Sequence, residues 1–460
     1  MSDAPAPEFQ IVRNGDPSPV NIDWSKGLEN IQKGIADALN ARNVAFLLGA
    51  GCSSLRVDDA ELGVPTMQPL AEEFCATSLS ALPNADDTDP LADADDGDND
   101  EVEELDDWEV AASEPEPNPA PTPAWALTKD EIDYLSQVGV ELTGEYARNL
   151  ERLMEVLYSL RFVLTRSSKA GHNTRAQLLA GVIAKVQAFL WERCTEGAFA
   201  KGNTAVRDLY ERFYRKLVLR DRTLPRPWVF TTNYDLFNET AMDRLGVPYA
   251  NGFSGVIERR FNPATFRYAL AEQLDVSSRK WSAVDGFVYL CKLHGSISWT
   301  EDDHGLFPIR ETWPAAGGAK MMIFPTPAKL NASLASPYAD LFREFQSRIV
   351  REQSVLITAG YAFGDEHLNK IIYQALTIPT FRLIIFAAPD AGGEIGKLRD
   401  LGDPRIWIVG GDGPTAGSRA HYFETVVEHF MPQQPSERID DAVRNVLRAM
   451  APERDEPNEP

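Results

Sequence analysis

Short apolar runs and longer amphipathic stretches alternate along this chain. Between residues 27 and 41, Leu28, Ile31, Ile35 and Leu39 recur at helical spacing, which predicts an amphipathic helix. The all-apolar run Val44–Leu48 follows and ends directly in two glycines. A short apolar run bounded by glycines is typical of a strand that is buried on both faces.

Comparable apolar runs return in the second half of the chain. They predict strands at 229–233, 287–293, 321–324, 354–358, 381–386 and 406–409. Helical or turn-forming stretches separate these runs, and this alternation is typical of α/β proteins with a parallel sheet. The predicted fold class is therefore α/β, a Rossmann-like doubly wound parallel sheet.

The middle of the chain has a helical pattern instead. Leu150, Leu153, Leu157 and Leu160 keep a 3.6-residue spacing, and a similar spacing continues beyond residue 178. We interpret residues 124–221 as a helical subdomain inserted into the α/β fold. The Rossmann domain is then expected to consist of residues 27–83 and 222–430.

Three further segments complete the predicted organisation. Residues 1–26 contain four prolines and are expected to form a loose N-terminal arm. Residues 84–123 are acidic and rich in proline and cannot bury enough apolar area to offset the entropy of ordering. We predict a disordered loop there, with a partner-binding tail anchored by Trp108 as the alternative. Residues 431–460 are expected to form a C-terminal helix and tail.

The charge of the chain is uneven. The formal net charge is −24, and 16 Asp or Glu residues without any Lys or Arg lie between Asp86 and Glu116. The remainder is only mildly acidic and shows no basic surface, so no direct binding to nucleic acid is predicted.

Other compositional features concern location and metals. The polar start lacks the apolar core of a signal peptide, and no stretch approaches the ~18 apolar residues of a spanning helix. We therefore expect a cytoplasmic protein without membrane contact. Four scattered cysteines, without a CxxC pair, argue against a disulfide framework and a zinc ribbon, and no metal is predicted.

Four polar segments follow predicted strands, where open α/β sheets bind ligands. The first is Gly49-Ala50-Gly51-Cys52-Ser53, whose backbone N–H groups can approach a pyrophosphate. A tight turn without a ligand remains the alternative. In the second, Thr231–Asp235, the Asn233 amide can hold a water or a ribose hydroxyl. Asp235 can serve there or simply cap the next helix.

The third and fourth segments contain histidines. His294 follows a predicted strand and precedes Gly295, and a histidine can act as a general base near neutral pH. A structural histidine is the alternative at this position. The fourth segment, Thr358–Asn369, contains a glycine turn whose backbone can approach a nucleotide. Asp365 in that segment can also be an ordinary helix cap.

Together, the four segments resemble the sirtuin-like NAD-binding family. The resemblance rests on the GAG-x-S turn, the T-x-N-x-D strand end, the H-G turn and the later G-x-x-F-x-D-x-H-x-N element. It covers roughly residues 40–75 and 225–415 and is closest to the bacterial branch found in anti-phage systems. It implies that NAD lies in a cleft of the Rossmann core beside a smaller inserted domain.

The resemblance also implies roles for individual residues. Gly49, Ala50, Gly51 and Ser53 are expected at the phosphates, Thr232, Asn233 and Asp235 at the nicotinamide ribose, His294 at the catalytic position with Gly295 and Ser296 in the same turn, and Gly360 and Asp365 at the adenosine half. Asn233 is expected to position the attacking water and His294 to accept a proton. Asp235 would orient the ribose or support Asn233.

The chain departs from classical sirtuins in three ways. It lacks the paired CxxC motifs, its insert is long and helical, and a Thr precedes Asn233 where deacylases typically carry a Gln. These departures favour hydrolysis of NAD, as a substrate, over protein deacylation. An NAD-dependent deacylase and a non-enzymatic NAD- or ADP-ribose-binding assembly module remain the alternatives.

The resemblance further implies that the activity is controlled by a partner. Relatives are associated with a HerA-type hexameric DNA-translocating ATPase, among other partners. The expectations are accordingly a homo-oligomer, NAD+ as the small-molecule partner, and a separately encoded ATPase of this type.

Overall fold

The computed structural model describes residues 7–57, 60–80, 122–199, 204–275, 277, 280–301, 309–313, 320–322 and 337–433. Its helices are α1 (Leu28–Leu39), α2 (Met67–Ser80), α3 (Lys129–Gln137), α4 (Leu150–Thr165), α5 (His172–Phe199), α6 (Ala205–Leu217), α7 (Phe237–Leu245), α9 (Tyr338–Ile349), α10 (Glu366–Leu376), α11 (Gly393–Asp400) and α12 (Phe423–Thr425). Its strands are β1 (Glu8–Arg13), β2 (Asp16–Asp23), β3 (Asn43–Leu48), β4 (Ser54–Val57), β5 (Ala60–Gly63), β6 (Trp228–Thr231), β7 (Tyr249–Ala250), β8 (Phe253–Ser254), β9 (Arg259–Phe261), β10 (Ala271–Asp275), β11 (Lys280–Ala283), β12 (Val288–Lys292), β13 (Gly295–Glu301), β14 (Ile309–Glu311), β15 (Lys320–Met322), β16 (Ser354–Ala359), β17 (Arg382–Phe386) and β18 (Ile406–Gly411).

A nine-stranded sheet forms the centre of the molecule, in the order β2-β1-β18-β17-β16-β3-β6-β12-β7. The strands from β18 to β7 are parallel to their neighbours. Numbered along the chain, β3, β6, β12, β16, β17 and β18 have the spatial order 3-2-1-4-5-6, that of dinucleotide-binding Rossmann folds. The predicted fold class is confirmed, and the strand order reverses between β3 and β16.

Successive residues of the central strands pack into two different apolar layers. In β3, Phe46 and Leu48 join one hydrophobic cluster, whereas Leu47 joins the other. Helices α1 and α6 contribute to the first cluster and α9, α10 and α11 to the second. Because both faces are covered, these strands are apolar without alternation, which is why they stand out in the sequence.

The N-terminal segment differs from the loose arm expected over residues 1–26. Strand β1 pairs antiparallel with β18, and β2 pairs with β1 at the sheet edge. Phe9 and Ile11 are buried, and the ring of Phe9 lies 4.7 Å from that of Trp24. Pro17 and Pro19 fall in the edge strand, where a missing N–H costs no ladder hydrogen bond. The prediction of a loose arm is therefore wrong for these residues, because the prolines on which it rested are compatible with an edge strand.

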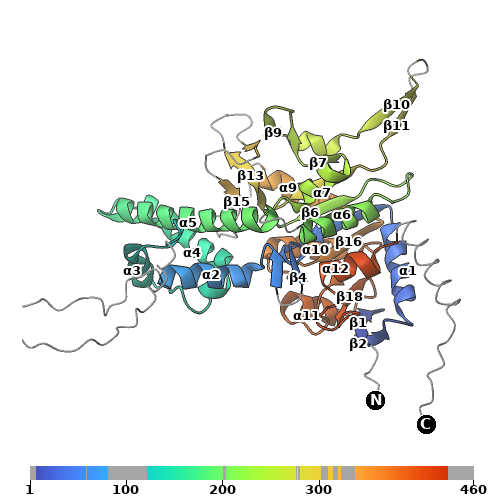
Figure 1. Cartoon of the computed structure of the whole chain (residues 1–460), viewed down its shortest axis with the longest axis horizontal. Coiled ribbons are helices and arrows are strands. Elements are labelled where there is room, and N and C mark those ends of the chain that lie inside the picture. Colours follow the sequence, from blue (N-terminus) through green and yellow to red (C-terminus); the bar gives the residue numbers. More distant parts are fainter. Residues whose placement is uncertain are drawn as a thin grey trace, which may run out of the picture.

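Helices fill the long connection between β3 and β6, as expected, but they divide differently between the two parts. Helix α2 lies within residues 27–83, which the sequence assigned to the Rossmann domain. It packs instead on α4 and α5 of the insert, and Phe74 contacts Trp125 and Phe189. Figure 1 shows this helical layer extending away from the sheet. Helix α6 lies within residues 124–221, which the sequence assigned to the insert. It packs instead on the sheet, where the ring centroid of Phe213 lies 5.2 Å from that of Phe46.

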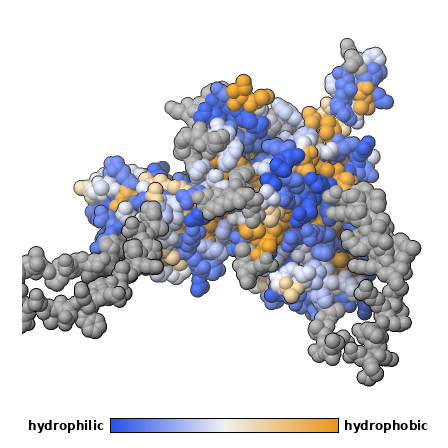
Figure 2. Space-filling view, in the orientation of Figure 1, coloured by the Kyte–Doolittle hydropathy of each residue, from blue (hydrophilic) through white to orange (hydrophobic). Residues whose placement is uncertain are grey.

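A second sheet, not expected from the sequence, lies above the parallel one in the view of Figure 1. Its order is β15-β13-β14-β9-β8. Residues 320–322 belong to this antiparallel sheet, although the run 321–324 was predicted as a strand of the doubly wound sheet. A separate hairpin of β10 and β11 projects from the body (Figure 1), with Leu274 and Trp281 exposed on it. Figure 2 shows apolar surface on this hairpin and at its base.

Two predicted segments lie mostly outside the described residues. These are the acidic loop at 84–123, of which only residues 122 and 123 are described, and the C-terminal helix and tail beyond residue 433. Within the described part of the chain, no helix has the length and apolar character needed to cross a membrane.

Candidate functional site

The four polar segments predicted from the sequence follow strands that end at one level. Leu48 at the end of β3 pairs with Thr231 of β6 and with Ala359 of β16. Thr231 in turn pairs with Lys292, the last residue of β12. Asn233 and His294 each lie two residues beyond that last pair. They therefore emerge from the carboxyl ends of neighbouring strands about 4.8 Å apart.

The amide of Asn233 is held in one orientation. Its Nδ2 donates to the Gly49 carbonyl at 2.9 Å and to Ser53 Oγ at 2.7 Å. A carbonyl can only accept, so the contact with Gly49 fixes which end of the amide is nitrogen. Both amide hydrogens are thereby used. Oδ1 remains as an acceptor, and no described residue donates a hydrogen bond to it.

Ser53 connects Asn233 to Asp235. The Ser53 hydroxyl accepts from Asn233 and donates to Asp235 Oδ2 at 2.5 Å, while Asp235 Oδ1 accepts from the Phe237 N–H at 3.1 Å. Ser53 and Asp235 are each 2% exposed. This geometry fits the expectation that Asp235 supports Asn233. It places Ser53 beneath the amide, rather than facing a phosphate.

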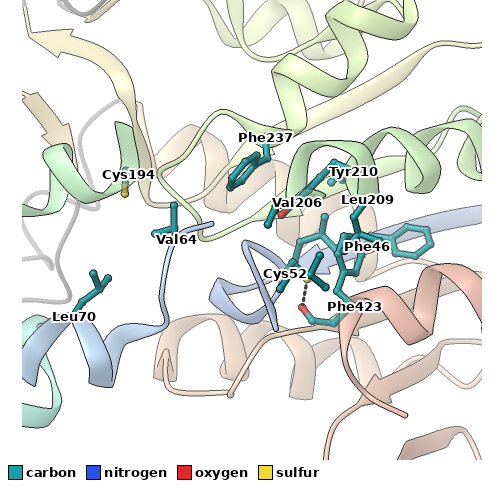
Figure 3. Close-up of a cluster of buried hydrophobic side chains, with 14 of the residues drawn as sticks. Phe46, Cys52, Val64, Leu70, Cys194, Val206, Leu209, Tyr210, Phe237 and Phe423 are labelled. Carbon is teal, nitrogen blue, oxygen red and sulfur yellow. Dashed lines mark hydrogen bonds between the residues drawn. The ribbon is translucent and has the colours of Figure 1, made fainter. Parts of the chain in front are cut away.

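Helix α6 also reaches this network. Tyr210 of α6 places its hydroxyl 3.5 Å from Ser53 Oγ, and its ring stacks on Phe237. Burial, followed by the nearby charge of Asp235, raises the pKa of Tyr210 well above its ordinary value. Cys52 lies in the same apolar cluster (Figure 3), where its Sγ donates to the Ala359 carbonyl. Burial raises the pKa of the Cys52 thiol, so it is a packing residue and no nucleophile.

The glycine turn after β3 packs tightly against the turn after β16. The N–H groups of Gly49 and Gly51 donate to the carbonyls of Ala359 and Gly360. A Cβ on Gly49 would lie 2.4 Å from the Gly360 oxygen, so this approach requires glycine. In this conformation the two glycines bind backbone instead of phosphate. Ala50 is exposed, and its N–H is the donor of the turn that has no hydrogen-bond partner within the described residues.

His294 contacts the fourth segment directly. Its Nε2 lies 3.0 Å from Asp365 Oδ2, and the two side chains are 5% and 11% exposed. Asp365 Oδ1 accepts from the N–H groups of His367 and Leu368 and so caps α10. The helix cap considered for Asp365 is therefore present, and the same side chain also contacts His294. His367 itself is exposed and packs edge-on against Phe342.

The remaining predicted residues belong to the supporting backbone. The Thr232 N–H donates to the Leu48 carbonyl, which ties β6 to β3. Gly295 has a φ of +92°, a conformation that favours glycine. Ser296 is fully buried, and its hydroxyl contacts Ser298 Oγ and the Tyr234 carbonyl. Through the Tyr234 carbonyl, Ser296 stabilises the loop that carries Asn233.

A buried ion pair lies beneath this loop and was missed from the sequence. Lys292 Nζ lies 3.1 Å from Glu239 Oε1 and also donates to the carbonyls of Tyr234 and Asp235. Burial raises the pKa of Glu239 to about 7, and the Lys292 ammonium opposes this shift. A lysine within the apolar run 287–293 was the available signal, since a buried charge requires a partner.

Metal ligands do not gather at this site. Across the described ranges, no group of three or more His, Cys, Asp or Glu side chains has the arrangement needed for a metal ion. The four cysteines are all buried, and they lie in separate elements: Cys52 after β3, Cys75 in α2, Cys194 in α5 and Cys291 in β12.

One protein family matches the part of the chain that contains most of these side chains. A model of the SIR2-like domain family matches residues 227–391, a span that contains Asn233, Asp235, His294 and Asp365. The glycine turn at 49–51 lies outside the matched span. No curated protein matches the chain. The family match supports a sirtuin-like family and, with it, an activity that involves NAD.

Proposed function

We propose that this SIR2-like protein hydrolyses NAD+ at the bond between nicotinamide and ribose. The observation that carries the proposal is the orientation of Asn233. Its two amide hydrogens are committed to Gly49 and Ser53, so the free acceptor Oδ1 remains where a nucleophilic water can donate to it. His294 emerges from the neighbouring strand at the same level.

The chemistry needs few groups from the protein. Nicotinamide is a good leaving group, and its departure from the anomeric carbon passes through an oxocarbenium-like state. A water then forms the new C–O bond, the C–N electron pair leaves with nicotinamide, and one proton passes to a base. Positioning and charge stabilisation supply most of the acceleration in such a reaction. Asn233 positions the water, and His294 accepts the proton.

The cysteines weigh against protein deacylation. Each lies buried in a different element, so the four cannot together hold the zinc module of the deacylases. The second candidate is a non-enzymatic NAD-binding module. The glycine turn does not distinguish it from the hydrolase, because both functions would use its N–H groups at the phosphates and backbone contacts occupy two of them. That module would bind NAD or ADP-ribose tightly without turnover.

The test is release of nicotinamide and ADP-ribose by the pure protein, together with calorimetric binding of both nucleotides. Asn233→Ala and His294→Ala should each lower turnover by about 10²–10⁴-fold, the range for positioned acid–base groups. His367→Ala is the matched control, since the His367 side chain is exposed in the first turn of α10, two residues beyond Asp365, and its loss should leave turnover unchanged.

Undiminished turnover in both site variants would exclude this assignment. Binding of ADP-ribose without turnover, under every activating condition tried, would favour the non-enzymatic module. Formation of O-acyl-ADP-ribose from an acyl-lysine peptide would favour the deacylase.

The resemblance to the anti-phage branch extends the proposal to biology. In this view, the chain is the effector of an abortive-infection system, acts as a homo-oligomer and is controlled by a separately encoded HerA-type hexameric ATPase. The neighbouring genes and the mass of the assembly in solution test these two points. A monomer that is active on its own would contradict them.

A further inference from the structure

The contact between His294 and Asp365 joins two strand ends that are not neighbours. His294 follows β12 and Asp365 lies beyond β16, and the sheet order places β3 and β6 between these strands. Three strand spacings amount to about 14 Å. The segment from Gly360 to Asp365 therefore crosses the carboxyl edge of the sheet, packing first on the glycine turn and then on His294.

Backbone hydrogen bonds hold the Asp365 carboxylate in place independently of its contact with His294. Oδ1 accepts from two backbone N–H groups at 2.8 and 3.1 Å, which leaves Oδ2 as the atom that faces the histidine. The preceding turn is equally constrained. Phe363 is 3% exposed and has a φ of +56°, a backbone conformation that bulky side chains rarely adopt. Its carbonyl accepts from Asn369 Nδ2 at 2.7 Å, and Asn369 also contacts Tyr361.

We propose that Asp365 is a positioning residue that selects the tautomer of His294. The carboxylate accepts from Nε2–H, so the neutral ring carries its proton on Nε2 and presents an unprotonated Nδ1 to the site. No described residue hydrogen-bonds to Nδ1. A histidine whose one nitrogen is held by a carboxylate is oriented for proton transfer at the other.

This inference rests on the proposed hydrolysis only in the role that it gives His294, which is to accept a proton from the attacking water. When Nδ1 accepts a proton from the attacking water, Nε2–H stays with Asp365, and the carboxylate stabilises the imidazolium that forms. The role differs from the contact with adenosine expected from the sequence. It assigns Asp365 to the same end of the nucleotide as His294.

Two substitutions separate this role from helix capping. Asp365→Asn keeps the cap, because Oδ1 must still accept from His367 and Leu368, but it turns the amide nitrogen toward His294. A donor at that position forces Nε2 to accept and moves the ring proton to Nδ1. Asp365→Ser also keeps a capping oxygen but does not reach the ring. Glu366→Gln is the matched control, since it removes a neighbouring carboxylate that is exposed and paired with Lys370.

The measurement is the ¹⁵N NMR signature of the His294 ring in the full chain at pH 8.5. With six histidines in the sequence, His294 is assigned by loss of its signal in His294→Gln. We expect Nε2–H in the wild type and in Glu366→Gln, Nδ1–H in Asp365→Asn, and a mixture in Asp365→Ser. In the turnover assay, kcat should fall at least ~100-fold in Asp365→Asn, with KM changed by less than about threefold.

The ring signature does not depend on catalysis, so the two proposals fail separately. Loss of the proposed hydrolysis would show as no turnover in the wild type while the tautomer still reverses in Asp365→Asn. The positioning role is overturned if the wild-type ring carries its proton on Nδ1 or on both nitrogens at pH 8.5, or if Asp365→Asn leaves the ring unchanged. An equal fall of kcat in Glu366→Gln would also overturn it.

Discussion

Asn233 donates a 2.7 Å hydrogen bond to the hydroxyl of Ser53, although 180 positions separate the two residues in the chain. Ser53 follows the first central strand and Asn233 follows the second. The same serine donates to Asp235, so one hydroxyl connects both polar residues of the T-x-N-x-D strand end. The orientation of the proposed catalytic amide therefore depends on the turn after β3.

Ser53→Ala should reduce turnover more than it reduces binding. Loss of the hydroxyl frees one amide hydrogen of Asn233 and leaves Asp235 Oδ2 without its donor, at a cost of about 1–3 kcal/mol. If Asn233 acts mainly in the transition state, kcat falls by about 5–150-fold and KM changes little. Steady-state kinetics of nicotinamide release measures both constants.

Ser54→Ala is the control for this variant. Ser54 is the next residue, and its hydroxyl donates to Glu61 on the β4–β5 hairpin instead of to the site. Its kinetics should match those of the wild type. A Ser53→Ala protein with unchanged kcat would show that the orientation of Asn233 does not depend on this hydroxyl.

Lys292→Met should strongly destabilise the fold. The substitution leaves Glu239 buried without its cation and removes the donor to the Tyr234 and Asp235 carbonyls. Removing one partner of a buried ion pair typically costs about 3–5 kcal/mol. Urea unfolding at pH 7.5 measures the loss, and Lys370→Met, which breaks an exposed pair with Glu366, should cost less than about 1 kcal/mol.

The double variant Lys292→Met/Glu239→Leu separates charge from packing. Replacing both charges with apolar groups should recover much of the lost stability, because no unpaired carboxylate remains in the interior. A double variant as unstable as Lys292→Met alone would mean that the hydrogen bonds to the two carbonyls carry the effect.

Glu239 should give the stability a specific pH dependence. Burial raises its folded-state pKa to about 7 from 4.5, so the folded protein retains a proton that the unfolded chain loses. This contribution is fully present below pH 4.5 and is lost as the pH rises through 7. The Tm of the wild type minus that of Glu239→Gln should therefore fall between pH 4.5 and 7 and level off above it. A difference that is flat or rises over this range would contradict the assignment.

Gly49→Ala should prevent the close packing of the two turns. The new Cβ would lie 2.4 Å from the Gly360 oxygen and 2.6 Å from the Tyr361 Cα, which are backbone atoms that cannot move aside cheaply. We expect a loss of about 1–3 kcal/mol, as for other overpacked sites. Gly364→Ala is the control, since a Cβ at that position would meet nothing within 4 Å and the φ of Gly364 is not positive. Equal stability of the two variants in thermal unfolding would contradict the close approach.

The sequence was sufficient for the parallel sheet because burial on both faces makes strands such as Val44–Leu48 continuously apolar. It failed for β1 and β2, where edge position tolerates the prolines that suggested an arm. The small antiparallel sheet was also missed. Its strands β8, β9 and β14 have only two or three residues, too few to show a period.

The proximity of Asn233 and His294 could be predicted from the sequence, but the contacts made by the predicted site residues could not. Strand ends place Asn233 and His294 together by topology, which the sequence pattern already contains. The contacts of Ser53 with Asp235 and of Asp365 with His294 join segments that are far apart in the chain, and no local pattern encodes them. Lys292 was visible as a charge in an apolar run, yet its partner Glu239 lies on α7, the helix that follows a different strand.

The proposed function requires that Asn233 and His294 meet at the anomeric carbon of one bound NAD. A crystal structure of the protein with a carba-NAD analogue, in which a methylene replaces the ribose ring oxygen and prevents cleavage, tests this most directly. We predict that the nicotinamide-bearing ring lies within hydrogen-bonding reach of Asn233 Oδ1 and of the His294 ring, with the pyrophosphate near the Ala50 N–H. A nucleotide bound elsewhere, or with Asn233 and His294 facing different cavities, would contradict it.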